Sequence, residues 1–174
     1  MNLFATILGL AAVALFVFSY QLKTRRGIIW CNAVSRLLYV AQYLLLGAFE
    51  GALLDVVAFF VSLLCCGRNK GFVKKYFVLT VILTNVAIVG IGMLSYQDIF
   101  SLLPIFGVVF ETLALWLKKE RSIRIVSLLG APFWLVYNLL NGAYGSAIGN
   151  VITLVSISVA IIRYGIPQKK AESL

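Results

Sequence analysis

Residues 44–57 read LLLGAFEGALLDVV, and residues 139–152 read LLNGAYGSAIGNVI. The two stretches align without a gap at a shift of 95 residues, and the same shift pairs LKTRRGI at 22–28 with LKKERSI at 117–123. Each copy joins a basic loop to a glycine-alanine-aromatic turn, and Asp55 of the first copy becomes Asn150 in the second. Self-similarity at one fixed spacing indicates two related structural units within the chain.

The composition indicates that these units lie in a membrane. Hydrophobic residues make up 62% of the 174-residue chain, charged residues only 12%, and the mean hydropathy is +1.02. A helix needs about 20 mainly apolar residues to cross roughly 30 Å of hydrocarbon. Stretches of this kind occur at residues 3–20, 28–46, 50–66, 76–95, 99–117, 123–141 and 145–163. The sequence therefore predicts an all-α integral membrane protein with seven transmembrane helices.

The net charge of +9 is placed so that it orients these helices. Basic residues follow the first, third, fifth and seventh spans, whereas the turns GAFEG, SYQD and NGAYG contain none. Because Lys and Arg accumulate in cytoplasmic loops, we expect the amino terminus outside and the carboxyl terminus in the cytoplasm. The same rule, together with contact to anionic lipid of the bilayer, explains the basic residues without a nucleic-acid partner.

The repeat and the number of spans together predict a 3+1+3 arrangement. Residues 1–66 form the first triple-helix repeat, 67–97 a linker helix, 98–166 the second triple-helix repeat, and 167–174 a short cytoplasmic tail. A single linker helix lets both repeats start outside, so the repeats are parallel and related by an axis along the membrane normal.

The second and sixth spans each carry a polar or amphipathic stripe along one helical face. The stripes consist of Asn32, Ser35, Arg36, Tyr39, Gln42 and Tyr43 in the second span and of Ser127, Gly130, Trp134, Tyr137, Asn138 and Asn141 in the sixth. Lipid disfavours such faces, so both are expected to point into the protein. A water-filled path is one interpretation, and polar residues that merely join helices are the other.

Three ionisable residues, Arg36, Asp55 and Glu111, lie within spans, where such groups usually pair or line a pathway. At about 1.5 Å rise per residue, Arg36 lies about 12 Å and Glu111 about 9 Å from the cytoplasmic edge. We therefore expect a salt bridge between them, acting either as a gate or as a permanent structural pair. Asp55 lies at a different depth, and we do not expect the helices to bring it to Glu111.

Asp55 and Asn150 are each expected about 7–8 Å from the outer edge, on opposite sides of the axis between the repeats. Their side chains offer acceptors and donors suited to hydroxyl or amine groups, and Asp55 leaves room for proton coupling. In the alternative interpretation, Asp55 reaches the outer interface and Asn150 bonds to a neighbouring helix.

These features resemble the SWEET and PQ-loop superfamily of transporters. A closer likeness, over nearly the whole chain, is to small bacterial inner-membrane proteins of the YgjV family. That likeness rests on Leu103, Pro104 and Gly107 in LLPIFG, on Ala114 and Leu115, and on Trp134, Asn138 and Gly142 in FWLVYNLLNGAYG. It implies a multi-pass protein of the bacterial cytoplasmic membrane.

The SWEET resemblance also implies roles for individual residues. In SWEET proteins a pair of polar residues on the third and seventh helices faces the sugar, and the matching positions here are Asp55 and Asn150. SWEET proteins use hinge prolines in both repeats, whereas here Pro104 and Pro132 occur in the second repeat only. Further wall residues of a solute site are expected to be Tyr39, Trp134, Tyr137 and Asn138.

The sequence thus predicts a secondary transporter or facilitator that passes a small polar solute, of which a sugar is one candidate, by alternating access between two triple-helix bundles. The alternative is a non-transporting membrane receptor or binding protein of the same fold. The chain contains no histidine and no Gly-rich phosphate loop, and no cysteine spacing typical of a metal site. We therefore expect no enzymatic activity, cofactor or metal. Both a monomer and a homo-oligomer fit the sequence.

Overall fold

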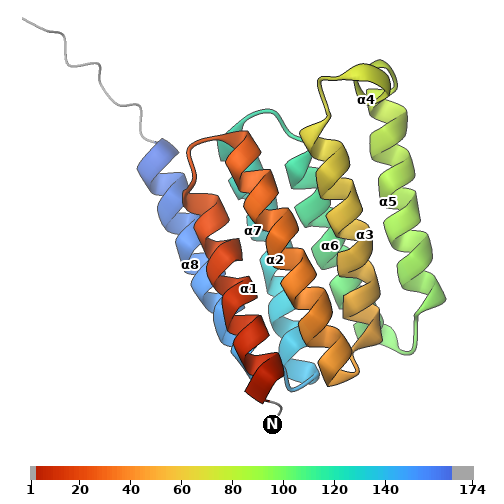
Figure 1. The fold of residues 1–174 in the computed structure, drawn as a ribbon, viewed down its shortest axis with the longest axis vertical. Helices are drawn as coiled ribbons and strands as arrows, with labels where there is room; N and C mark the ends of the chain where they lie inside the picture. The colour runs from red at the N-terminus through yellow and green to blue at the C-terminus, as the bar shows by residue number, and fades with distance from the viewer. Residues whose placement is uncertain (1–2, 166–174) are drawn as a thin grey trace, which may run out of the picture.

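The computed structural model describes residues 3–165, and all regular structure within them is helical (Figure 1). The long helices are α1 (Leu3–Gln21), α2 (Arg25–Leu46), α3 (Phe49–Cys66), α5 (Phe77–Leu94), α6 (Leu102–Leu115), α7 (Glu120–Leu140) and α8 (Tyr144–Gly165). Two short elements, α4 (Gly71–Lys75) and the 3-10 helix η1 (Ile99–Ser101), lie in connecting segments. The predicted all-helical class is confirmed.

Six of these helices are long and apolar enough to cross a membrane: α1, α2, α3, α5, α7 and α8. The remaining expected span, 99–117, is shorter and is divided into η1 and α6. Asp98 causes this division by accepting hydrogen bonds from the backbone N–H groups of Phe100 and Ser101 at 2.9 and 3.1 Å, which begins a tight first turn. Together η1 and α6 extend about 27 Å, close to the thickness of the hydrocarbon layer.

Helix α2 begins three residues before the expected start at residue 28. The hydroxyl of Thr24 accepts a hydrogen bond from the Gly27 backbone N–H at 3.3 Å, which caps the helix at that point. The basic residues that follow are therefore part of the first helical turn rather than of the loop.

The two repeated turns have the same backbone structure. Gly47 and Gly142 occupy equivalent positions and both adopt left-handed conformations, with φ of 71° and 66°. The residue after each glycine donates its N–H to a carbonyl five residues earlier, at 3.0 Å for Ala48 and 2.9 Å for Ala143. Only glycine adopts this conformation without strain, so the repeated glycine ends two equivalent helices in the same way.

We call α1, α2 and α3 one three-helix group and α6, α7 and α8 the other, because neighbours in each set pack against one another. Helix α2 lies between α1 and α3, and α7 lies between α6 and α8. The groups meet where α1 packs against α8 and α3 packs against α6, while α5 packs on the outside against α3 and α6. Successive long helices alternate in direction, and α1 and α6 run the same way (Figure 1).

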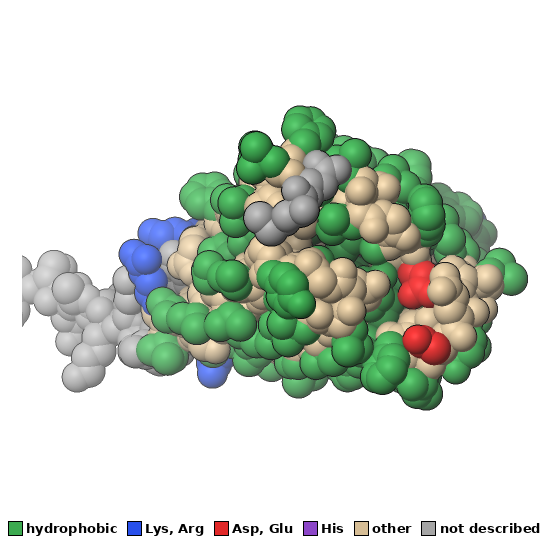
Figure 2. Space-filling model, turned by 90° about the horizontal axis from the view of Figure 1, so that it is seen from below, with side chains coloured by type: hydrophobic (Ala, Val, Ile, Leu, Met, Phe, Trp, Pro, Cys, Tyr) green, Lys and Arg blue, Asp and Glu red, His purple; other side chains and the backbone are tan. Residues whose placement is uncertain are grey.

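The two ends of the bundle differ in charge. The basic end carries the connections at 22–24, 67–76 and 116–119; together with Arg25, Arg26, Arg121 and Arg124 in the adjoining helices, they hold 11 of the 15 lysines and arginines. The amino-terminal end carries Leu3 and the connections at 47–48, 95–98 and 141–143, where the described acidic residues are Glu50 and Asp98. Figure 2 views the amino-terminal end and shows acidic side chains on one side of a largely hydrophobic surface.

The lateral surface is apolar, and the polar stripes are inside. Helix α5 buries only Thr80, Ile88 and Gly92, and most of its other large apolar side chains are exposed. Both predicted stripes are buried, with the exception of Asn141 at the end of α7. The expected inward orientation of these faces is therefore confirmed, and lipid covers the remainder.

Candidate functional site

Arg36 binds two carboxylates in the middle of the bundle. Its Nη1 donates to Asp55 Oδ1 at 2.6 Å, and its Nη2 donates to Glu111 Oε2 at 2.8 Å. Its Nε donates to Asn32 Oδ1, one helical turn earlier on α2, at 3.0 Å. The three charged side chains are 2%, 4% and 5% exposed. We call Arg36, Asp55 and Glu111 the triad.

The triad agrees with one sequence prediction and corrects another. The expected ion pair between Arg36 and Glu111 is present. The expectation that Asp55 stays apart from Glu111 is wrong, because both carboxylates hold the same guanidinium. The predicted depths of these residues follow their backbone positions. The long Arg36 side chain extends beyond the depth of its own backbone on α2 and contacts both α3 and α6.

A small polar chamber of about 20 Å³ adjoins the triad. It is lined by Phe16, Arg36, Tyr39, Tyr43, Asp55, Glu111, Trp134, Asn138 and Asn150. Eight of these nine residues form four pairs separated by 95 positions: Phe16 with Glu111, Tyr39 with Trp134, Tyr43 with Asn138, and Asp55 with Asn150. The chamber is thus built from equivalent positions of both three-helix groups.

The centre of this chamber is marked by a hydrogen bond between equivalent residues. The hydroxyl of Tyr43 donates to Asn138 Oδ1 at 3.0 Å, across a sequence separation of 95. The two residues that form this bond therefore occupy equivalent positions of the sequence repeat. Sequence reasoning did not select Tyr43 as a site residue, although its place in the polar stripe and its pairing with Asn138 at the repeat spacing were visible.

An aromatic cluster separates the chamber from the amino-terminal end. Tyr43 and Trp134 are stacked with ring centroids 6.1 Å apart, and Tyr137 meets both rings edge-on, at 6.3 and 5.8 Å. Tyr137 is expected from the sequence to be a wall residue of the solute site. The structure instead places it in the lining of a second cavity, beyond the chamber. A residue one turn along α7 from Trp134 faces the same side of the helix but a different level.

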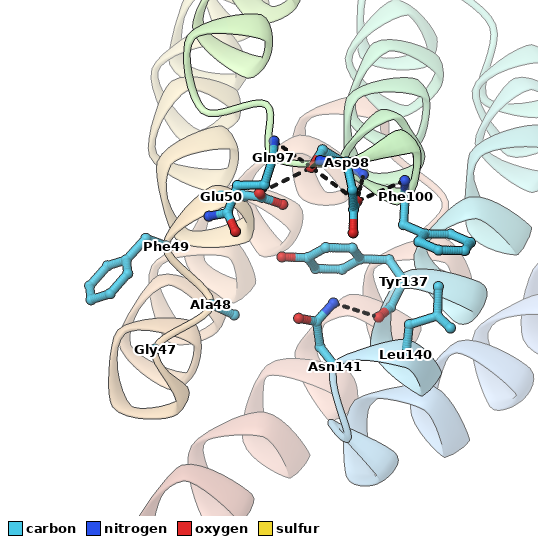
Figure 3. A pocket seen from close by; sticks show the side chains of 11 residues that line it. Gly47, Ala48, Phe49, Glu50, Gln97, Asp98, Phe100, Tyr137, Leu140 and Asn141 are labelled. Atoms are coloured by element: carbon cyan, nitrogen blue, oxygen red, sulfur yellow. Dashed lines mark hydrogen bonds between the residues drawn. The ribbon is translucent and has the colours of Figure 1, made fainter.

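That second cavity, which we call the vestibule, opens at the amino-terminal end and measures about 320 Å³ (Figure 3). Figure 3 shows the Tyr137 ring extending across it, with Glu50, Gln97 and Asp98 on one side and Asn141 on the other. Ser101 donates to Glu50 Oε1 at 3.1 Å and links the start of α3 to η1. These residues were missed because they lie at helix ends, where no periodic pattern marks them.

The basic end is closed by arginines that bind main-chain carbonyls of the opposite three-helix group. Arg25 of α2 donates to the carbonyls of Leu115 and Leu117 at 2.7 and 2.8 Å. Arg124 of α7 donates to the carbonyls of Tyr20 and Leu22 at 3.0 and 2.9 Å. The two carbonyl pairs are 95 residues apart, so each group caps the same helix end of the other. Arg68 adds a hydrogen bond to the carbonyl of Trp116.

The two prolines occupy different environments. Pro104 is buried in the first turn of α6, where its missing N–H leaves no helical hydrogen bond unmade. Pro132 lies inside α7 and is exposed on the lateral surface, away from the chamber lining. Their role as hinges stays a prediction.

The chamber offers hydrogen-bond donors, acceptors and aromatic faces around the ion cluster, and its volume of about 20 Å³ has room for about one water molecule in this conformation. Within residues 3–165, no group of three or more His, Cys, Asp or Glu side chains is placed to hold a metal ion.

Comparison with known proteins adds one match. The model of a family described as bacterial inner membrane protein, Imp-YgjV, matches residues 3–167, which include the chamber, the vestibule and both three-helix groups. No curated protein matches the chain, and no solved structure does.

Proposed function

The chain belongs to the Imp-YgjV family and is a multi-pass protein of the bacterial inner membrane, and on this premise we propose that it is a secondary transporter or facilitator of a small polar solute. Transport proceeds by alternating access, in which α1–α3 and α6–α8 rock against each other around the chamber. The solute binds between Asp55 and Asn150, with Tyr39, Trp134 and Asn138 as walls.

The observation that carries this proposal is the pairing of chamber residues at the repeat spacing. A site made of equivalent positions from two similar units lies on the axis between them, and transporters built from repeats bind substrate at such an interface. The parallel course of α1 and α6 (Figure 1), together with the contact between Tyr43 and Asn138, supports an axis that runs along the helices. This supports the 3+1+3 arrangement, with α5 as the linker, and a SWEET-like architecture.

The two cavities support a path for the solute. The vestibule leads from the amino-terminal end to the ring of Tyr137, and the chamber lies behind the stacked rings of Tyr43 and Trp134. At the basic end, Arg25 and Arg124 close the bundle. If the basic end is cytoplasmic, as the distribution of Lys and Arg favours, this conformation is closed to the cytoplasm and has a vestibule on the outside.

We also propose that the chain is not an enzyme. Both buried carboxylates of the triad are bound by Arg36, and no Ser, Thr, Cys, Lys or His side chain lines the chamber beside them. A non-transporting receptor of the same fold is the competing function, and it predicts binding without flux.

Thermal stabilisation tests the proposal. Purified protein in detergent is screened against sugars, amino acids, nucleosides, vitamins and organic acids, because a ligand at 100 times its Kd stabilises the folded state by about 2.7 kcal/mol. We expect one class to raise the Tm of the wild type but not of Asp55→Asn. Glu120→Gln, a carboxylate neutralised away from both cavities, serves as the matched control and should keep the shift.

Flux in proteoliposomes then separates the two functions. Uptake of the stabilising compound by wild type and by Glu120→Gln, with loss of uptake in Asp55→Asn, is the expected result. Binding without uptake indicates a receptor, and equal stabilisation of all three proteins places the ligand outside the chamber.

A further inference from the structure

The triad places one basic and two acidic side chains inside the membrane. One guanidinium faces two carboxylates, and all three groups are at least nine-tenths buried. If both carboxylates are ionised, the cluster has a net charge of −1, and an uncompensated charge at this depth costs several kcal/mol.

The groups that surround the triad are neutral and do not balance that charge. They are Tyr20 of α1, Tyr39 and Tyr43 of α2, Trp134 and Asn138 of α7, and Asn150 of α8. Arg124, the other fully buried arginine in the described part of the chain, binds carbonyls at the ends of α1 and does not line the chamber. The charge must therefore be balanced within the cluster itself or by a small bound species.

The chamber limits what that species is. Its volume of about 20 Å³ accommodates roughly one water molecule. A hydrated or organic cation does not fit beside Arg36 in this conformation, whereas a proton on one carboxyl group needs no space. A protonated carboxyl still accepts from Arg36 through its carbonyl oxygen and gains a donor.

The equivalent positions of the other three-helix group carry no charged side chains. At the equivalent positions of the other three-helix group stand Ala131 for Arg36, Asn150 for Asp55, and Phe16 for Glu111. Those neutral positions pack within the same bundle, so an ion cluster is not required to hold helices together at this level. A function other than packing explains why a costly cluster is present.

The geometry also links the cluster to movement. The bond from Arg36 to Asp55 joins α2 to α3 within one three-helix group, whereas the bond to Glu111 crosses to α6 of the other group. If the two three-helix groups separate, Arg36 stays paired with Asp55, and the two charges balance. Glu111 loses its ion pair and becomes accessible to water.

We propose that the triad binds one exchangeable proton, shared between Asp55 and Glu111, and that opening of the bundle releases it. Proton binding follows from the charge and geometry of the cluster. Its coupling to solute movement rests on the proposed transport function.

Infrared spectroscopy of the full-length protein in lipid nanodiscs tests proton binding without any solute. A protonated carboxyl group has a C=O stretching band that a carboxylate lacks. We expect wild type to show one such band at neutral pH and to lose it on titration to higher pH. Asp55→Asn and Glu111→Gln should each lack the band, because Arg36 then faces a single carboxylate, and Glu120→Gln should retain it.

The same samples give a second readout. A folded state that binds one more proton than the unfolded state loses stability as the pH rises through the titration. The Tm of wild type should fall over the pH range in which its band disappears, and the Tm of the two triad variants should not. Absence of the band from wild type, its persistence in both triad variants, or pH-independent stabilisation of wild type by Na⁺ would overturn the proposal.

Failure of proton binding and failure of transport are distinguishable. A band that behaves as expected, in a protein for which no compound binds or crosses, keeps the proton site and rejects transport. Solute flux with no band and no response to a pH gradient keeps transport and rejects the proton.

Discussion

Arg36 joins three helices through three different nitrogen atoms. The contacts to Asn32, Asp55 and Glu111 are all between buried groups, so each is made in surroundings where an unmade bond is expensive. The two carboxylates are not equivalent, because Asp55 belongs to the same three-helix group as Arg36 and Glu111 belongs to the other. Substitutions at these positions are therefore expected to have unequal effects.

Arg36→Gln should destabilise the protein far more than Glu111→Gln. The first change leaves two buried carboxylates without a cation, and loss of one partner from a buried ion pair costs about 3–5 kcal/mol. The second leaves Arg36 paired with Asp55. Melting temperatures in detergent, compared with the control Glu120→Gln, which lies away from both cavities, check this order. Equal losses in the two triad variants would contradict the shared role of Arg36.

At the scale of helices, contact between the two three-helix groups depends on close approach and on capped ends. Gly149 of α8 lies against α1 so closely that a Cβ there would overlap the Val13 side chain. At the basic end, Arg25 and Arg124 bind carbonyls that have no partner within their own helices. Both features belong to the interface that the proposed alternating access would open.

Gly149→Ala should destabilise the bundle, by about 1–3 kcal/mol, because the added methyl group pushes α8 from α1. Gly90→Ala is the matched control, since nothing lies within 4 Å of a Cβ at that position on α5. The control should be neutral or more stable by up to about 1 kcal/mol, through its higher helix propensity. A similar Tm for both variants would contradict the tight contact between α1 and α8.

Arg25→Gln should loosen the basic end. Arg25 also donates to the carbonyl of Cys65 at 3.1 Å, and the Cys65 side chain is fully buried, so this thiol reports on opening. With Cys31 and Cys66 replaced by Ser, maleimide labelling of Cys65 should be faster in Arg25→Gln than in the parent.

The neighbouring Arg26 provides the control for that experiment. It is exposed and carries the same charge, so Arg26→Gln removes a basic residue from the same first turn of α2 without removing a cap. Labelling of Cys65 at the parent rate is expected. Faster labelling in both variants would mean that positive charge at the start of α2, and not the hydrogen bonds of Arg25, keeps the basic end closed.

At the scale of the whole molecule, seven long helices cross from one end to the other in alternation, and the basic residues gather at one end (Figure 1). The vestibule and the described acidic residues Glu50 and Asp98 lie at the opposite end. The two ends thus differ both in charge and in access to the chamber. Under the proposed transport function, the orientation in the membrane decides which compartment the vestibule faces.

The basic end should face the cytoplasm. In a cysteine-free background, Gln97→Cys should react with a membrane-impermeant maleimide added to intact spheroplasts. Lys119→Cys, exposed at the other end, should react only after the membrane is opened. The reverse pattern would invert the proposed path, with the vestibule opening to the cytoplasm.

The sequence alone determined the membrane class, the helical structure and the inward orientation of the polar stripes. Apolar length, the position of glycine turns and helical periodicity are local properties, so the residues themselves record them. The repeat spacing correctly paired Asp55 with Asn150 in one chamber and equated the turns of Gly47 and Gly142. The pairing of Arg36 with Glu111 also followed from local counting of depth along each helix.

Only the tertiary structure decided which side chains meet across helices. The bond between Arg36 and Asp55, the place of Tyr137 in the vestibule, and the reciprocal caps made by Arg25 and Arg124 depend on side-chain reach and on which helices are neighbours. Neither the reach of a side chain nor the choice of neighbouring helices follows a periodic pattern along the chain. The local sequence fixes what each helix presents, and packing fixes what that face contacts.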